Sequence, residues 1–146
     1  MFSPQAQISY RPHQYWGQKL SPDSGVFISY DVEPFLPTYL AHNNTPTAYP
    51  PSRAEGFLPL NIYYAWLLPT SDEVFQSAAS TSADTLKTQA IVSGQADVAN
   101  AAVYPNYAIF DTPLTSLYGA NLPKLQAIKA TVDPNNVMGL AGGFKL

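Results

Sequence analysis

An amide and a phenol lie two residues apart, at Asn61 and Tyr63, in the most apolar run of the chain, FLPLNIYYAWLL (57–68). If this run is a strand, alternate residues share a face, so these two side chains lie together. Both can donate a hydrogen bond to a carbonyl oxygen, and such a donor is most effective in a dry, apolar site. We therefore predict that Asn61 and Tyr63 are the catalytic residues and point into an apolar cavity.

Other residues with chemical potential form weaker patterns. His42 could act as a general base, but a lone histidine at a helix end is more often a cap or a surface residue. Asp31 and Glu33 would share a strand face, which is only a weak indication of acid–base chemistry. The sequence has no Ser-His-Asp grouping with a nucleophile motif and no phosphate-binding loop. With zero cysteines and two histidines, we expect no metal site.

Two strands and a helix are expected around the candidate residues. Residues 25–31 and 57–68 are rich in β-branched and aromatic residues, which is typical of strands. In the second strand, Ile62, Tyr64 and Trp66 are expected on the face opposite Asn61 and Tyr63, with both faces covered. A short helical segment is expected over residues 34–42, and a loop over residues 43–55.

Two longer helices complete the predicted elements. Thr70 and Glu73 fit a capping box, apolar residues follow at helical spacing, and Gly94 is a stop signal. The helical spacing runs through Phe75, Ala79, Ser82, Leu86 and Ala90. The last helix is expected over residues 122–132, with Asn121 as its cap and Asp133-Pro134 as its end. Its expected apolar stripe is Leu122, Leu125, Ile128 and Val132.

These elements predict a single α+β domain over residues 1–146, with a small antiparallel sheet packed against two main helices. The net charge is −3, so we expect no nucleic-acid partner. No run approaches the roughly 20 apolar residues of a membrane span, and no secretory signal is visible, so a cytoplasmic protein is expected. Because 146 residues leave an aromatic strand to cover, we also expect a homodimer or a larger homo-oligomer.

The C-terminal 44 residues, 103–146, carry a family resemblance. They resemble the C-terminal signature of fungal berberine-bridge-like FAD-linked oxidases, and the resemblance continues upstream to about residue 25. The upstream part includes Tyr49-Pro50-Pro51-Ser52-Arg53, Ile62-Tyr63-Tyr64 and Trp66. The C-terminal elements are Asn106-Tyr107, Tyr118-Gly119, Asn121, Leu125-x-x-Ile128-Lys129 and Asp133-Pro134-x-Asn136-Val137.

The resemblance implies a truncated substrate-domain fold that lacks the flavin-binding domain, so no cofactor is expected. It implies that the strand with Asn61 and Tyr63 borders the substrate. It also makes five residues candidates for substrate binding: Tyr64, Trp66, Arg53, Asn106 and Tyr107. Each candidate has a structural alternative. Tyr64 and Trp66 could be core residues, and Arg53 could form a structural ion pair. Asn106 and Tyr107 could simply pack against their neighbours.

Two functions of different classes follow. The first is a cofactor-independent enzyme of fungal secondary metabolism that folds a hydrophobic polyene or terpenoid and promotes its cyclisation. An intramolecular [4+2] cycloaddition, the reaction of a Diels-Alderase or pericyclase, requires only orientation and a hydrogen bond to a conjugated carbonyl. The alternative is a non-catalytic substrate-binding half or accessory subunit of a split FAD-linked oxidase.

Overall fold

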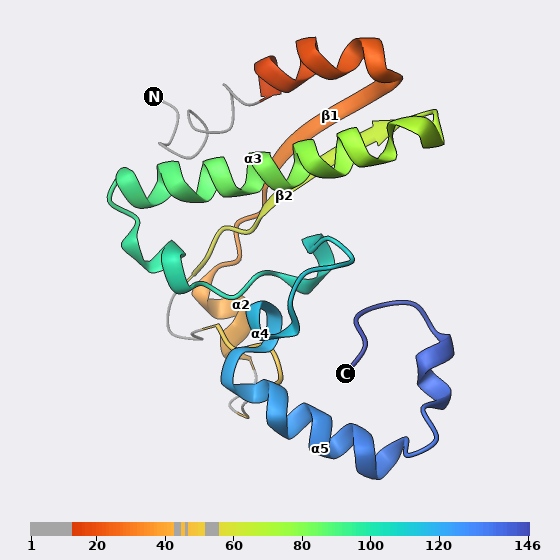
Figure 1. The fold of residues 1–146 in the computed structure, drawn as a ribbon. Helices are drawn as coiled ribbons and strands as arrows, with labels where there is room; N and C mark the ends of the chain where they lie inside the picture. The colour runs from red at the N-terminus through yellow and green to blue at the C-terminus, as the bar shows by residue number, and fades with distance from the viewer. Residues whose placement is uncertain (1–12, 43–44, 46, 52–55) are drawn as a thin grey trace. The chain divides into compact units, whose positions relative to one another are not determined.

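The computed structural model describes residues 13–42, 45, 47–51 and 56–146. It confirms an α+β chain in which an antiparallel pair of strands is accompanied by helices (Figure 1). The chain divides into two compact units, residues 1–33 with 58–101 and residues 34–57 with 102–146. The single domain over residues 1–146 stays a prediction.

The sheet of the first unit pairs strands β1 (Gly25–Val32) and β2 (Leu60–Trp66). The register places Ile28 opposite Tyr64 and Tyr30 opposite Ile62. β2 is shorter than the predicted 57–68 because proline residues bound it, with Pro59 before the strand and Pro69 after Leu68. A proline cannot donate a ladder hydrogen bond, so it ends regular pairing.

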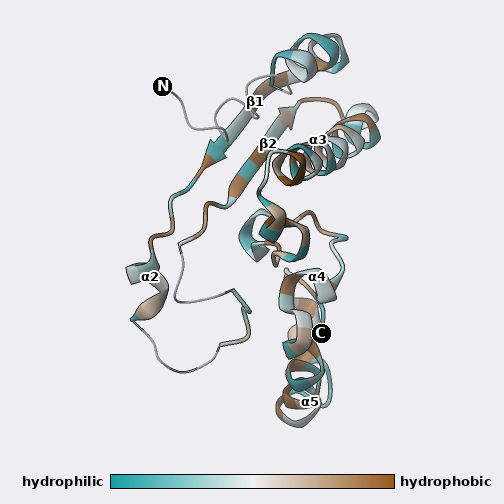
Figure 2. Ribbon diagram, turned by 90° about the vertical axis from the view of Figure 1, so that its left-hand side faces the viewer, coloured by the Kyte–Doolittle hydropathy of each residue, from teal (hydrophilic) through white to brown (hydrophobic). Residues whose placement is uncertain are grey.

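One face of this sheet carries the hydrophobic core of the first unit. Helix α3 (Asp72–Val92) lies along one side of the two strands (Figure 2). The buried core consists of Leu20, Tyr64, Phe75 and Ala78, and Leu20 ends the helical residues 13–20. The predicted division of β2 into two faces is confirmed, because Ile62, Tyr64 and Trp66 all contact this core. Cover was predicted for the opposite face as well, but Tyr63 on that face is 52% exposed.

The start of α3 differs from the predicted capping box. A short 3-10 turn, η2 (Pro69–Ser71), precedes the helix, and no side chain caps its first turn. The backbone N–H of Ser71 instead donates to the carbonyl of Leu68 at 2.9 Å, and Asp72 binds the Trp66 indole. The predicted end is confirmed, since Gly94 has a φ of 97° just after the helix.

The second unit contains three α-helices among its described residues: α2 (Pro37–Ala41), α4 (Leu114–Tyr118) and α5 (Leu122–Val132). α2 starts at Pro37 rather than Pro34, because Leu36 precedes a proline and is extended, with φ −67° and ψ 155°. The bounds predicted for α5 are confirmed, but Asn121 does not cap it through its side chain. Its amide donates to the carbonyls of Thr47 at 3.3 Å and Ala48 at 3.1 Å.

The apolar stripe of α5 is only partly covered. Leu122 and Leu125 are half-buried, whereas Ile128 and Val132 are 49% and 76% exposed. The buried apolar residue of this unit is Leu117 on α4, at 0% exposure. Of the helices in the described part of the chain, none is long and apolar enough to cross a membrane.

Candidate functional site

The two faces of β2 place the predicted site residues in different environments. Tyr64 is 9% exposed and its ring lies 6.3 Å from that of Phe75, edge to face. The Trp66 ring stacks on Phe75 with centroids 4.8 Å apart, and its indole N–H donates to Asp72 at 2.7 Å. Tyr64 and Trp66 thus occupy the core position left open as the alternative to substrate binding.

Three hydroxyl groups form a closed triangle inside the first unit. The Tyr30 and Tyr64 hydroxyls lie 2.5 Å apart, and Ser82 Oγ lies 2.8 Å from the first and 2.7 Å from the second. Each group comes from a different element: β1, β2 and α3. Burial is the main cause that raises the pKa of Tyr64 above its usual value. The Tyr64 hydroxyl is therefore held neutral, and the triangle is a structural arrangement rather than an acid–base site.

The opposite face of the sheet carries the predicted catalytic residues. The register places Tyr63 opposite Ser29 and Asn61 opposite Asp31. Tyr63 is 52% exposed, and its ring lies 5.9 Å from that of Phe27, which is 54% exposed. Ser29 donates a 2.6 Å hydrogen bond to Asp31. The face thus offers an aromatic pair with a phenol beside an amide and a carboxylate, and it is open to solvent.

Two other predicted residues lie in the second unit. Asn106 and Tyr107 belong to the 3-10 turn η4 (Pro105–Tyr107). The Asn106 amide donates to the Tyr104 hydroxyl at 2.8 Å, and the Tyr107 ring meets the Tyr104 ring at 5.0 Å. Arg53 lies outside the described residues. The predicted residues that the structure describes are thus divided between the two faces of β2 in the first unit and η4 in the second.

A cluster that the sequence did not reveal surrounds Tyr104. Six rings of the second unit form one network of ring contacts, with centroids 5.0 to 6.2 Å apart. We call them the aromatic cluster: Phe35, Tyr39, Tyr49, Phe57, Tyr104 and Tyr107. The dense aromatics of residues 35–57 were a visible signal, but their contact with residues 104–107 spans about half the chain and has no local pattern.

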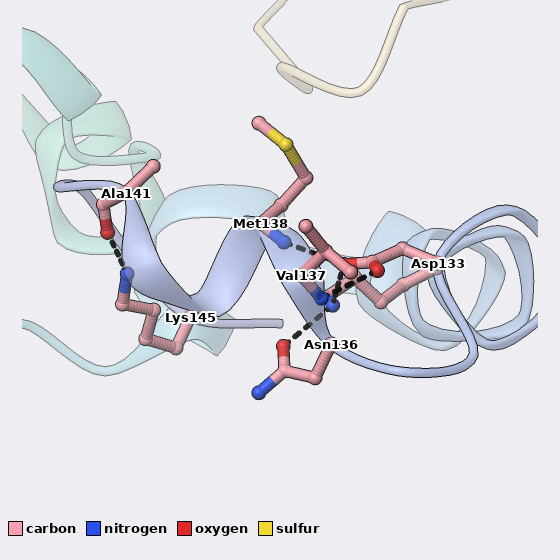
Figure 3. A network of polar contacts seen from close by, with 7 residues as sticks. Asp133, Asn136, Val137, Met138, Ala141 and Lys145 are labelled. Carbon is pink, nitrogen blue, oxygen red and sulfur yellow. Dashed lines mark hydrogen bonds and ion pairs between the residues drawn. The ribbon is translucent and has the colours of Figure 1, made fainter.

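A second polar network closes the end of α5 (Figure 3). The Asp133 carboxylate accepts backbone N–H groups from Val137 at 2.7 Å and Met138 at 3.1 Å. Lys129 donates to Asp133 at 2.6 Å and to the side-chain oxygen of Asn136 at 2.7 Å. Lys129 above all, together with the two backbone donors, holds the pKa of Asp133 below its ordinary value. This carboxylate fixes the turn that follows the helix.

Replacing Lys129 with methionine is expected to move the pKa of Asp133 towards its ordinary value. The folded state lowers this pKa, so the carboxylate's contribution to stability is present above the ordinary value and is lost as pH falls through the lowered one. A pH titration of the Val137 and Met138 amide nitrogen shifts by NMR measures the midpoint. Lys124→Met, an exposed position on the same helix, is the control. Equal midpoints in the wild type and Lys129→Met would contradict the assignment.

The comparison with protein families connects this segment to one of them. Residues 103–141 match the family model described as "Berberine and berberine like". The match covers η4, α4, α5 and the Asp133 network, so these residues are similar to that family. Searches of curated proteins and of solved structures gave no match.

The residues in the described part of the chain do not by themselves build a flavin site. A flavin needs backbone or cationic donors for its pyrophosphate and donors aimed at its ring. The amide of Asn106, a predicted substrate-binding residue, donates to the Tyr104 hydroxyl. Among the described residues, no three potential metal ligands of the His, Cys, Asp or Glu type gather either.

Proposed function

We propose that this chain is the substrate-side part of a berberine-bridge-like FAD-linked oxidoreductase, and that it binds an uncharged organic substrate while other protein holds the flavin. The family match at residues 103–141 carries the proposal. The chain supplies apolar and aromatic surface, and redox chemistry would come from the flavin. The proposal corresponds to a substrate-binding half or accessory subunit.

The first unit supports a role in contact with more protein. Its sheet has two strands in the described residues, so each strand has one edge without a neighbour. An isolated two-stranded sheet is only marginally stable, and free edges invite further pairing. Its open face also exposes Phe27 and Tyr63. A second copy, as predicted, or a flavin-bearing polypeptide would cover these surfaces.

A cofactor-independent cyclase is the second candidate. The observation that favours it is the Phe27–Tyr63 pair, which joins an apolar aromatic surface to a phenol that can donate to a substrate carbonyl. Holding a flexible polyene so that its reacting carbons meet lowers the entropic part of the barrier, which is worth several kcal/mol in well-oriented reactions. A hydrogen bond to a conjugated carbonyl adds to that effect.

The two candidates predict different metabolites in an organism that lacks this chain. An oxidase removes hydrogen from its substrate, so the accumulating compound should be two hydrogen atoms heavier than the missing product. A cyclase converts one isomer into another, so the accumulating compound should have the same mass as the product. Deletion of the gene, with high-resolution mass spectrometry of extracts, measures the difference. An isomer that accumulates would overturn the oxidase proposal and favour the cyclase.

Purification of the chain from an organism that expresses a tagged copy gives a second measurement. We expect the tagged chain to purify with a polypeptide that carries flavin, which absorbance and mass spectrometry of a denatured extract detect. A colourless chain that nevertheless restores the missing product in vitro, without added flavin, would contradict the oxidase proposal. The deletion strain rescued by the untagged gene is the control, because it excludes effects on neighbouring genes.

A further inference from the structure

The aromatic cluster of the second unit has two hubs. Phe35 meets the rings of Tyr39, Phe57 and Tyr104 at 5.0, 5.1 and 5.3 Å. Tyr104 in turn meets Tyr49 at 5.8 Å, as well as Tyr107. All six ring contacts of the cluster are tilted or edge to face, the arrangements that aromatic pairs prefer. Four of the six rings are tyrosines, so phenolic hydroxyl groups lie within an apolar, aromatic environment.

The cluster is not a closed core. Leu117 is 0% exposed, whereas none of the six rings is buried and Tyr39 is 62% exposed. Aromatic rings usually contribute most to a small core because they bury the largest areas. Here they remain half open, so additional apolar surface would be buried if a further ring packed against them.

The hydroxyl of Tyr49 has no hydrogen-bond partner within the described residues. It is also not among the fully buried polar atoms, since every buried side-chain oxygen of the described residues has a partner. The hydroxyl therefore reaches the surface from within an aromatic environment. A phenol in this position can donate to an acceptor atom that arrives from outside.

We propose that the aromatic cluster is a binding site for an uncharged, planar, conjugated carbonyl compound, whose ring packs on the cluster while its oxygen accepts a hydrogen bond from Tyr49. The site consists of residues of the second unit and includes none of β2, and it requires neither the oxidase nor the cyclase function. Ring packing provides the affinity, and the single donor fixes the orientation.

The electrostatics of the site favour a neutral ligand. Burial, followed by the neighbouring Tyr104, raises the pKa of Tyr49 to about 12. The Tyr49 hydroxyl is therefore a neutral donor at physiological pH. An environment that disfavours a phenolate also disfavours a ligand carboxylate at the same place, because both bring a negative charge out of water.

Coumarin, a fused-ring lactone, is a suitable probe because it has the required ring and carbonyl oxygen. Isothermal calorimetry of the full chain should show saturable binding of coumarin, with weaker binding of naphthalene, which lacks the acceptor. Coumarin-3-carboxylate should bind more weakly than coumarin. Tyr49→Phe keeps the ring and removes the donor, so coumarin affinity should fall by about two- to tenfold while naphthalene affinity stays constant.

Tyr118→Phe is the matched control, since this half-buried tyrosine of the same unit lies outside the cluster. It should leave the affinity for both ligands unchanged. The proposal would be overturned by non-saturable coumarin binding, by tighter binding of the carboxylate, or by an equal loss in Tyr118→Phe. Unchanged coumarin affinity in Tyr49→Phe, or loss of naphthalene binding together with that of coumarin, would also exclude the proposed hydrogen bond.

Discussion

Replacement of Phe75 by alanine is expected to lower the free energy of unfolding of the first unit by about 3–5 kcal/mol. Phe75 is 0% exposed, and its ring is stacked on Trp66 and meets the edge of Tyr64. It is thus the largest fully buried side chain that α3 packs against β2. Its removal leaves a cavity between these elements, and few other buried residues are available to fill it.

Tryptophan fluorescence during denaturation with urea measures this loss for the first unit. The chain has two tryptophans, Trp16 and Trp66, and both lie in this unit. Phe27→Ala is the matched control because the ring is 54% exposed on the open face of the sheet. Phe27→Ala should lower the free energy of unfolding by at most about 1 kcal/mol, which is the contribution of a cross-strand side-chain pair. Similar losses in both variants would show that α3 is not held by Phe75.

The elements that the sequence predicted well are those with a strong local pattern. Residues 122–132 have a proline at the second position and Asp133-Pro134 at the end, and both bounds of α5 are as predicted. The same holds for Gly94 after α3, since a residue with positive φ there is a local requirement. Alternation in β2 also predicted which residues share a face, because that property depends only on strand geometry.

A local sequence pattern cannot identify a contact that a side chain makes with a residue far away in the sequence. Thr70 and Glu73 fit a capping box, yet Pro69 starts a 3-10 turn and the first turn of α3 has no side-chain cap. Asn121 stands at the predicted cap position, but its amide binds the carbonyls of Thr47 and Ala48. In each case a tertiary contact or a neighbouring proline outweighs the local preference.

Prediction of the candidate site from the sequence was limited for the same reason. The sequence placed Asn61 and Tyr63 on one face but did not determine that helix α3 would cover the other. The aromatic cluster depends on Phe35 meeting Tyr104 across almost 70 residues, and no spacing rule relates them. Its residues were visible as an aromatic-rich composition only. A binding surface made from distant segments is therefore a property of the fold rather than of a motif.

The hydroxyl triangle gives the second large effect. Ser82→Ala is expected to lower the free energy of unfolding by about 1–2 kcal/mol, because it removes two buried hydrogen bonds. The loss is limited since the hydroxyls of Tyr30 and Tyr64 still bind each other at 2.5 Å. Tyr64→Phe should have a similar cost, because Ser82 and Tyr30 remain 2.8 Å apart.

A double-mutant cycle tests whether the three groups act as a unit. Ser82→Ala and Tyr64→Phe both remove the bond between these two residues, so the double variant should lose about 0.5–1.5 kcal/mol less than the sum of the single losses. Ser80→Ala is the control for the helical propensity of alanine, since Ser80 is exposed on the same helix. Urea unfolding followed by tryptophan fluorescence measures all four variants. Strict additivity, or equal stabilities of Ser80→Ala and Ser82→Ala, would show that the triangle does not hold β1, β2 and α3 together, and the open face with Tyr63 would then depend on Phe75 for its support.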